Sequence, residues 1–391
     1  MKGIELPMKN IMEIEECCGC GVCVESCPVK CIEMKQSKEG FLFPEVGSSC
    51  IKCGKCYAVC PIDTPLCGNK YIKSYAAYSR DEDVRRKSSS GGVFTKLAET
   101  VIKSGGSVFG AAFNTDMQLF HMEINRLSDI EKLRGSKYLQ SDMKTVYKKV
   151  MDNIQRKILT MVVGTPCQIA ALKKFIKTDS EYLIAIDLVC HGVPSPGMFE
   201  GYIKTLEKKY HGKVYKYNFR EKKGNGISYS THIELLDRNN DKKTICIDGN
   251  EDPYIMNFLT NRLQRHSCFY CPYTKIERVG DITIADYWGV EEAHPELKEV
   301  QGVSLVLVNT KKGDKYLKMT KGLTLIETEE EKFSKKNNHL YEPPKLENAR
   351  DEFYGEYEKR GFDSKFYKKV FLPRHFKIFL LKRKILMLIR K

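Results

Sequence analysis

The sequence lacks long apolar segments. None of its 391 residues belongs to a run approaching the ~18 consecutive apolar residues of a membrane-spanning helix. The first ten residues, MKGIELPMKN, lack the apolar core of a secretory signal peptide. A composition of 42% apolar and 29% charged residues excludes collagen-like, mucin-like and wholly disordered chains. We therefore expect a globular, cytoplasmic protein of two or three domains, at roughly 100–200 residues per domain.

The charge balance argues against a nucleic-acid-binding protein. The formal net charge is +15, but residues 360–391 alone hold 11 basic residues and one acidic residue. Cysteines that bind iron become thiolates, so a 4Fe–4S core of charge +2 with four of them carries a net charge of about −2. With metal bound, the rest of the chain is close to neutral. We expect no nucleic-acid partner.

Cysteine is abundant and unevenly distributed. Eight of the 16 cysteines lie between Cys17 and Cys60. A reducing cytoplasm keeps thiols free, so such a concentration indicates metal ligation before disulfides. The eight repeat the pattern C-x2-C-x2-C-x3-C-P with an offset of 33 residues. The two runs are Cys17, Cys20, Cys23 and Cys27, and Cys50, Cys53, Cys56 and Cys60.

This spacing is typical of bacterial ferredoxins with two 4Fe–4S clusters. Three closely spaced cysteines bind one cluster, and the fourth, beside proline, binds the other cluster. Gly19, Gly21 and Gly54 suit loops whose amides approach sulfide. A pair of structural zinc sites is the alternative, but such sites usually use two cysteine pairs. The predicted ligands are therefore crossed: a first set of Cys17, Cys20, Cys23 and Cys60, and a second set of Cys27, Cys50, Cys53 and Cys56.

Three cysteines of the N-terminal region, Cys18, Cys31 and Cys67, fall outside this pattern. We interpret Cys31 as a small buried hydrophobe. After a short linker at residues 70–78, apolar strands alternate with amphipathic helices, as in α/β domains. We expect strands at 107–113, 158–164, 182–189, 280–289 and 303–310, helices at 91–106, 143–157, 165–176, 197–210 and 253–263, and antiparallel strands within 213–249 that turn at 239–241.

Four further cysteines lie beside the predicted strands. Cys167 and Cys190 each follow an apolar strand, while Cys268 and Cys271 form a C-x2-C pair before another. The carboxyl ends of parallel strands share one edge of a sheet, where ligands usually bind. These four thiols, the third set, suit another cubane. Inert cysteines and a zinc site remain alternatives.

Two Gly/Ser-rich turns are candidate phosphate sites. The segment 88–92 (SSSGG) directly precedes a helix, whose N-terminal amides and dipole favour an anion, and Arg85 and Arg86 come just before it. The segment 135–138 (GSKY) is the second candidate. Plain loops or helix caps are the alternative.

Taken together, the motifs resemble the family of coenzyme F-420 hydrogenase/dehydrogenase beta subunits over about residues 1–310. The resemblance rests on the double ferredoxin run followed by KSSSGGVFTKLA, RGSKYLQSD, VVGTPCQIAALKKF, DLVCHGVPSP and SCFYCPYTKIERVGDITIADYWG. It implies a dicluster ferredoxin fold (1–75) followed by a larger α/β flavoprotein domain with a mixed sheet (76–160 and 161–330). Beyond about residue 330 the chain is highly charged, and we expect a basic helical tail (331–391). The fold class is therefore α+β / α/β.

The resemblance also implies the cofactors and their ligands. The third set would bind a third 4Fe–4S cluster. The residues that would line FAD are Ser89, Ser90, Gly91, Gly92, Ser136, Lys137, Tyr138 and Gln140, with Thr165 and Gln168 at the border of the pocket.

The predicted function is that of an iron–sulfur flavoprotein oxidoreductase. A flavin exchanges electrons in pairs or singly, so it can link a two-electron substrate, such as a deazaflavin, to one-electron clusters. Lys137 would stabilise negative charge on the flavin or contact its phosphates. His191 is a candidate proton donor, against the alternative of a hydrogen-bonded loop histidine. Asp286 and Trp288 fit substrate contact or packing equally. A non-catalytic ferredoxin-like module that docks a partner reductase is the alternative function.

Two kinds of partner are predicted besides the small-molecule substrate. The first is a redox partner protein or a ferredoxin. The second is an anionic membrane surface, because residues 374–391 (RHFKIFLLKRKILMLIRK) combine basic and apolar side chains. Docking of a protein, or packing of this helix on its own body, are the alternatives.

Overall fold

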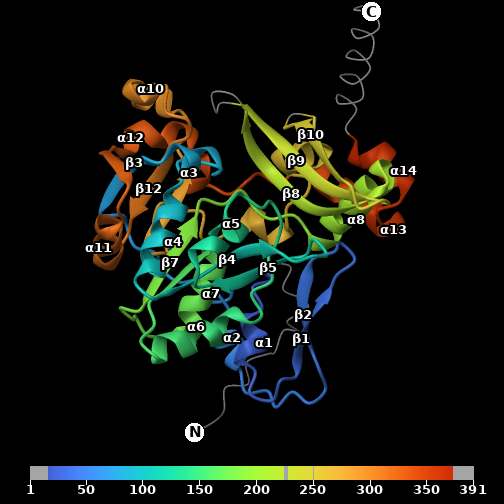
Figure 1. The fold of residues 1–391 in the computed structure, drawn as a ribbon. Helices are drawn as coiled ribbons and strands as arrows, with labels where there is room; N and C mark the ends of the chain where they lie inside the picture. The colour runs from blue at the N-terminus through green and yellow to red at the C-terminus, as the bar shows by residue number, and fades with distance from the viewer. Residues whose placement is uncertain (1–15, 224–227, 250, 373–391) are drawn as a thin grey trace, which may run out of the picture.

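The protein is described from a computed structural model, in which the described residues are 16–223, 228–249 and 251–372. They form an eight-stranded, a three-stranded and a two-stranded sheet. The N-terminal unit, in blue, lies against one side of the large sheet, and the three-stranded sheet lies beside the C-terminal helices (Figure 1). This architecture confirms the predicted fold class, a mixed α/β domain that follows a small cysteine-rich unit.

The large sheet is mixed, with strand order β13-β3-β12-β11-β7-β6-β4-β5. Its centre, β4, β6, β7 and β11, is parallel, whereas β5 and β12 run antiparallel to their neighbours. The strands are β3 (Lys73–Ser79), β4 (Ser107–Phe113), β5 (Leu119–Ile124), β6 (Thr160–Gly164), β7 (Leu183–Leu188), β11 (Ile282–Asp286), β12 (Ser304–Val308) and β13 (Leu323–Glu327).

Helices cover both faces of this sheet, which explains why its central strands are continuous apolar runs. In β6, Met161 and Val163 pack in the same core as helices α4, α5 and α11, whereas Val162 packs with α6 and α7. The helices are α4 (Val93–Lys103), α5 (Ile130–Leu133), α6 (Val146–Gln155), α7 (Pro166–Ile176) and α11 (Lys311–Met319), with the shorter α3 (Glu82–Arg86), α10 (Val290–Ala293) and α12 (Glu330–Phe333) around them.

The prediction of a linker at residues 70–78 is wrong over most of this segment. Residues 73–79 form β3, which pairs antiparallel with both β12 and β13. Ala76 and Ala77 are completely buried there. The segment is short and only moderately apolar, and it becomes a strand because two distant parts of the chain provide its partners.

The N-terminal unit contains α1 (Val22–Ser26), the hairpin of β1 (Ile32–Gln36) and β2 (Leu42–Val46), and α2 (Lys55–Ala58). Gly21 and Gly54 precede the two helices at equivalent repeat positions, with φ of 74° and 71°. A side chain is strained in this left-handed conformation, which accounts for glycine at both positions. Val22 and Val59 of this unit share a core with α6 and α7, so the unit packs directly on the large domain.

The three-stranded sheet consists of β8 (Gly212–Lys223), β9 (Ser228–Asp237) and β10 (Lys242–Asp248), and turns at 239–241 as predicted. One aromatic-rich core joins it to α8 (Pro196–Tyr210), α9 (Pro253–Leu259), α13 (Asn348–Arg360) and α14 (Ser364–Phe366). The segment 374–391, on which the membrane prediction rests, lies outside the described residues. Within the described ranges, no helix is both long and apolar enough to cross a bilayer.

Candidate metal and cofactor site

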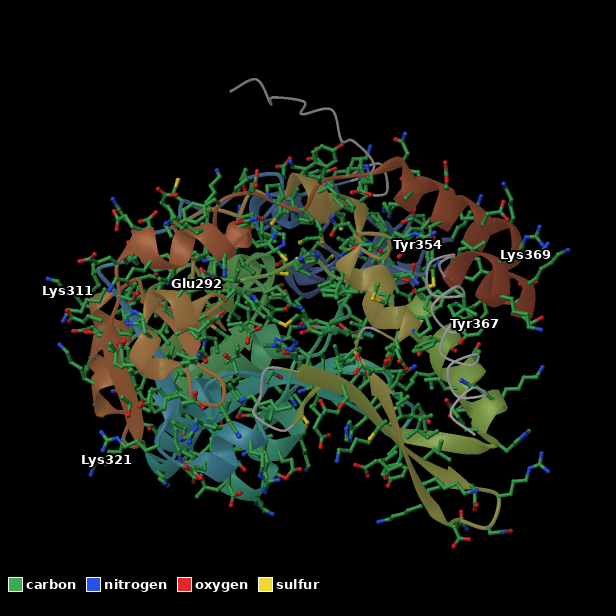
Figure 2. The ribbon with its side chains drawn as sticks, turned by 90° about the horizontal axis from the view of Figure 1, so that it is seen from above. Glu292, Lys311, Lys321, Tyr354, Tyr367 and Lys369 are labelled. Carbon is green, nitrogen blue, oxygen red and sulfur yellow. The ribbon has the colours of Figure 1, made fainter. Side chains whose placement is uncertain are left out.

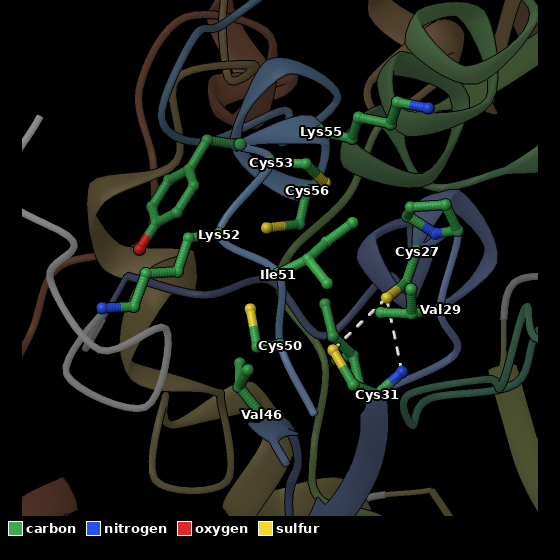
Figure 3. A pocket seen from close by; sticks show the side chains of 14 residues that line it. Cys27, Val29, Cys31, Val46, Cys50, Ile51, Lys52, Cys53, Lys55 and Cys56 are labelled. Carbon is green, nitrogen blue, oxygen red and sulfur yellow. Dashed lines mark hydrogen bonds between the residues drawn. The ribbon is translucent and has the colours of Figure 1, made fainter. Parts of the chain in front are cut away.

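The second set of cysteines surrounds one hollow at the surface of the N-terminal unit. All four members line it, together with Cys31 (Figure 3). Cys31 is therefore not the buried hydrophobe we expected. Its Sγ lies 3.5 Å from Sγ of Cys27, and its backbone N–H donates to the same sulfur. The pattern C-P-x2-C starting at Cys27 is the signal that pointed to this fifth thiol.

The first set surrounds a second hollow nearby. All four members line it, with Cys18. Burial, together with negative charge on Cys17 and Cys60, raises the pKa of the Cys23 thiol to about 12. The two hollows share Cys56 and Tyr57 in their walls, so they are adjacent. The structure thus brings the cysteines together in the crossed grouping that the repeat predicts.

The third set meets at the carboxyl edge of the parallel strands. Cys167 lies in the first turn of α7, after β6, and Cys190 follows β7. Cys268 lies in a short 3-10 helix, and Cys271 follows it. Burial, together with negative charge on Cys167 and Cys271, raises the pKa of the Cys190 thiol to about 12. Four thiolates here require a cationic core, because mutual repulsion and burial otherwise keep the thiols protonated.

The three sets offer only cysteine thiols as donors. In the described ranges, no group of three or more His, Cys, Asp or Glu side chains is arranged to hold a single metal ion. A cubane has different requirements, because each of its four irons takes a separate cysteine at its own corner. The donor chemistry of the three sets therefore fits iron–sulfur clusters better than the zinc alternative.

Cys18 connects the first and third sets. Its side chain packs in the same core as those of Cys20 and Cys167, and the pKa of its thiol responds to both of these cysteines. The carbonyl of Cys20 accepts a hydrogen bond of 2.7 Å from the buried hydroxyl of Tyr147 in α6. The sequence left Cys18 without a role. The structure places it at the junction of the two domains.

Arg265 and Gln140 hold the loop that carries Cys17. Arg265 is almost completely buried, and its Nε donates to the carbonyl of Cys17. Its Nη1 donates to Oε1 of Gln140 (2.9 Å), and its Nη2 to the carbonyl of Leu42 (3.0 Å). The amide of Gln140 donates to the carbonyls of Cys18 and Gly19. Gln140, predicted to line FAD, therefore contacts the cysteine loop.

A buried ion pair that the sequence motifs did not indicate supports the third set. Asp187 in β7 is fully buried and accepts hydrogen bonds from Nε (3.1 Å) and Nη2 (2.9 Å) of Arg278. It also accepts from the backbone of Gly280 and the hydroxyl of Thr283. This network joins the end of β7, just before Cys190, to the chain between Cys271 and β11. An acid inside an apolar strand was the available signal.

The two Gly/Ser-rich turns meet. The backbone N–H of Ser136 donates to Oγ of Ser89 at 2.7 Å. Ser90 and Gly91 are bound to β12, since Oγ of Ser90 donates to the carbonyl of Val303 and Gly91 N–H donates to Oγ of Ser304. A β-carbon on Gly91 would lie 2.4 Å from the carbonyl oxygen of Ala77, so only glycine fits there. Gly92 has a φ of 82° and precedes α4.

Cationic side chains surround these turns. Burial is the cause that lowers the pKa of Lys137 to about 7, and its Nζ donates to the carbonyls of Leu133 and Arg134, both at 2.8 Å. Lys222 donates to the carbonyls of Arg85 and Ser90, and burial lowers its pKa to about 8. Within the described residues, buried Nε of Arg85 has no hydrogen-bond partner. Cations held in this way fit a phosphate-bearing, anionic cofactor.

The remaining candidates occupy several environments. His191 donates from Nε2 to Oδ1 of Asn261 if that ring nitrogen carries the proton, and burial lowers its pKa to about 4. Thr165 and Gln168 form the capping box of α7. Asp286 forms an ion pair of 2.5 Å with Arg220, whose guanidinium lies over the ring of half-exposed Trp288. The catalytic and flavin-binding roles of these residues stay predictions.

Models of known families match most of the chain. Residues 74–148 match the N-terminal model, and residues 158–332 the C-terminal model, of the family described as "Coenzyme F-420 hydrogenase/dehydrogenase, beta subunit". Residues 16–64 match a 4Fe–4S dicluster domain. The chain belongs to the family of coenzyme F-420 hydrogenase/dehydrogenase beta subunits. These matches confirm the predicted resemblance, including the N-terminal 4Fe–4S dicluster domain.

Individual relatives of this beta-subunit-like chain are distant. A protein of Methanosarcina mazei, the F component of its F-420H2 dehydrogenase, is 23% identical over 195 residues, covering 46% of this chain and 55% of the relative. An uncharacterized protein of Methanocaldococcus jannaschii is 26% identical over 218 residues, covering 47% and 59%. The chain thus spans little more than half the length of these relatives. Among solved structures, a chain of the F-420-reducing NiFe hydrogenase complex from Methanosarcina barkeri aligns over 67% of this chain and 84% of that one, with 16% identity and a TM-score of 0.43.

Proposed function

We propose that the protein is an FAD- and 4Fe–4S-dependent oxidoreductase that passes electrons between a two-electron organic substrate and a one-electron protein partner. The observation that carries this proposal is the order of the cysteine sets. The third set lies at the sheet edge, and Cys18 packs in one core with Cys20 of the first set and Cys167 of the third. The second set is adjacent to the first, because the two hollows share Cys56 and Tyr57. The series ends at the protein surface.

Each set would hold one 4Fe–4S cluster. When bound, the clusters carry single electrons, and a flavin exchanges electrons in pairs or singly. The chain keeps the sets at fixed separations: Arg265 and Gln140 bind the loop of the first set, and the Asp187–Arg278 pair supports the loops of the third.

The FAD would lie against the two Gly/Ser-rich turns. Ser89, Ser136 and the backbone of segment 88–92 would bind its phosphates, and Lys137 and Lys222 would supply positive charge. Tyr138 and His191 both contact the ring of Phe258, with centroid distances of 4.6 and 5.0 Å. This shared contact places the 135–138 turn beside the segment that follows Cys190, so a flavin on the turn would lie near the third set.

The family supplies the substrate hypothesis. One relative bears the name of a component of an F-420H2 dehydrogenase, and we propose a reduced deazaflavin of this type, or another hydride-donating or hydride-accepting organic compound, as the two-electron substrate. We also propose a protein partner, because that relative is by its name one part of a dehydrogenase with several parts.

Anaerobic reconstitution tests the proposal. We expect about twelve iron atoms and one FAD per chain, and bleaching of the flavin band on addition of the reduced deazaflavin. About eight iron atoms without flavin would instead support a non-catalytic ferredoxin-like module. Bound flavin that no deazaflavin reduces would reject this substrate and keep the cofactor assignment.

A further inference from the structure

One proposed cluster ligand reaches the surface. Of the twelve cysteines in the three sets, all of which lie in the described ranges, only Cys53 is exposed; the others are buried or half-buried. Its neighbours from Ile51 to Lys55 are exposed as well. So are Pro28 and Val29, which line the same hollow, and Lys30, which follows them. Electron transfer between proteins slows steeply with distance, so the second set is where an external partner would exchange electrons.

The surface around Cys53 combines apolar and basic side chains. Ile51 is 61% exposed and Val29 is 41% exposed, and both of these aliphatic side chains line the same hollow. Lys52 and Lys55 lie at the rim of the hollow (Figure 3), and exposed Lys30 follows Val29. None of the 14 residues lining the hollow is acidic. We call these six residues, Val29, Lys30, Ile51, Lys52, Cys53 and Lys55, the Cys53 face.

We propose that the Cys53 face is the docking surface for an acidic one-electron carrier protein of the ferredoxin class. This inference rests on the proposed function and assigns the partner a place and a chemistry. Lysines around a small apolar centre favour a negatively charged partner and raise the association rate without tight binding. Rapid turnover requires such a transient contact, because the carrier must leave after each electron.

The backbone suggests a substitution that preserves the loops. Lys30 and Lys52 have φ of 52° and 55°, in the left-handed region. Asparagine tolerates this conformation better than most residues, so Lys30→Asn and Lys52→Asn remove charge with little strain. Together with Lys55→Gln they remove three positive charges from the Cys53 face. The control removes the same charge elsewhere, by Lys311→Gln, Lys321→Gln and Lys369→Gln; these exposed lysines lie at the two ends of the molecule (Figure 2).

The experiment uses the reconstituted full chain and a purified acidic two-cluster ferredoxin, reduced beforehand, in a stopped-flow spectrometer. For the wild type we expect the second-order rate constant to fall as salt increases. The triple variant of the Cys53 face should react about tenfold more slowly at low salt and show a flatter salt dependence. The control triple variant should retain most of the wild-type rate. The extent of reduction by excess dithionite should be equal in all three proteins, which shows that they carry the same amount of cofactor.

Two results would overturn the proposal: equal slowing in both triple variants, or a wild-type rate that does not respond to salt. A third result would also reject the carrier: the Cys53-face variant reacts with ferredoxin at the wild-type rate but no longer self-associates in sedimentation experiments. In that case the face would bind a second copy of the chain. Failure of the proposed function is distinguishable, because it appears as missing flavin or iron in the wild type before any carrier is added.

Discussion

Nη1 of Arg265 lies 2.9 Å from Oε1 of Gln140, and both side chains also donate to carbonyls of the loop that begins at Cys17. Arg265 precedes Cys268 of the third set by three residues, while Cys17 belongs to the first set. One buried guanidinium therefore fixes two proposed cluster sites relative to each other. Its charge lies over the ring of Phe43, at 4.0 Å from the centroid.

Replacing Arg265 by alanine should destabilise this junction. The change leaves the Cys17 and Leu42 carbonyls and the Gln140 amide oxygen without their donor, at a cost of about 1 kcal/mol or more each, so we expect a loss of ~3 kcal/mol in the free energy of unfolding. Anaerobic urea unfolding measures it. Arg262→Ala is the comparison, because Arg262 packs over Phe353 away from the cysteines. The Arg262→Ala variant should keep the electron paramagnetic resonance signal of the first cluster unchanged, whereas the Arg265→Ala variant should show an altered signal. Equal spectra for both variants would contradict the assigned role.

The crossed ligand sets predict specific losses of iron. Cys60→Ser should remove the first cluster, about four iron atoms per chain, and leave the signal of the second. Cys67→Ser should lose none, because Cys67 is exposed and lines neither hollow. Iron analysis with low-temperature spectra checks both. The signal of the second cluster is identified as the one that the Cys53→Ser variant loses. If Cys60→Ser lost that same signal, Cys60 would bind the second cluster and the crossed grouping would be wrong.

The buried Asp187–Arg278 pair should be essential for stability. Asp187→Asn leaves the Arg278 charge unpaired inside the protein, which typically costs ~3–5 kcal/mol. We expect a correspondingly lower unfolding midpoint and loss of iron from the third set. Asp179→Asn is the matched control, because Asp179 also pairs with a cation, Lys312, but its side chain is 87% exposed. Surface ion pairs contribute only about 0–1 kcal/mol to the free energy of unfolding. Similar midpoints for the two variants would refute the prediction.

Lys137 should couple FAD binding to proton uptake. Burial lowers its pKa to about 7 from an ordinary value of 10.5, so in the flavin-free protein it is largely neutral above pH 7. Nearby phosphate raises that pKa again, so binding at pH 8–9 should take up close to one proton per FAD. The same shift makes the flavin-free protein gain stability as pH rises from about 7 towards 10.5, because the folded state then binds fewer protons than the unfolded state.

Calorimetry of FAD binding in buffers of different ionisation enthalpy measures this uptake. Lys137→Gln should abolish most of it, whereas Lys311→Gln, an exposed lysine far from the turns, should not. Unchanged proton uptake in Lys137→Gln would remove Lys137 from the flavin site.

The sequence predicted those features that local patterns determine. The cysteine repeat predicted the first and second sets. Cys167 and Cys190 each follow an apolar run, and this pattern predicted the sheet edge at which the third set lies. Features that depend on distant partners could not be predicted. Residues 73–79 became β3 only through β12 and β13. Gln140 was expected at FAD, but Arg265 and the Cys17 loop, remote in sequence, determine its contacts. Cys18 has no pattern of its own, and its place follows from the packing of the N-terminal unit on α6 and α7.

The packing of Cys18 in one core with Cys20 and Cys167 has a kinetic consequence. In enzymes whose carrier domain swings on a tether, internal transfer depends on diffusion of that domain and slows in viscous solvent. Here the N-terminal unit shares a core with the large domain, so its separation from the sheet edge is constant. Internal transfer should proceed equally fast in glycerol and in water, and only the encounter with the external carrier should slow.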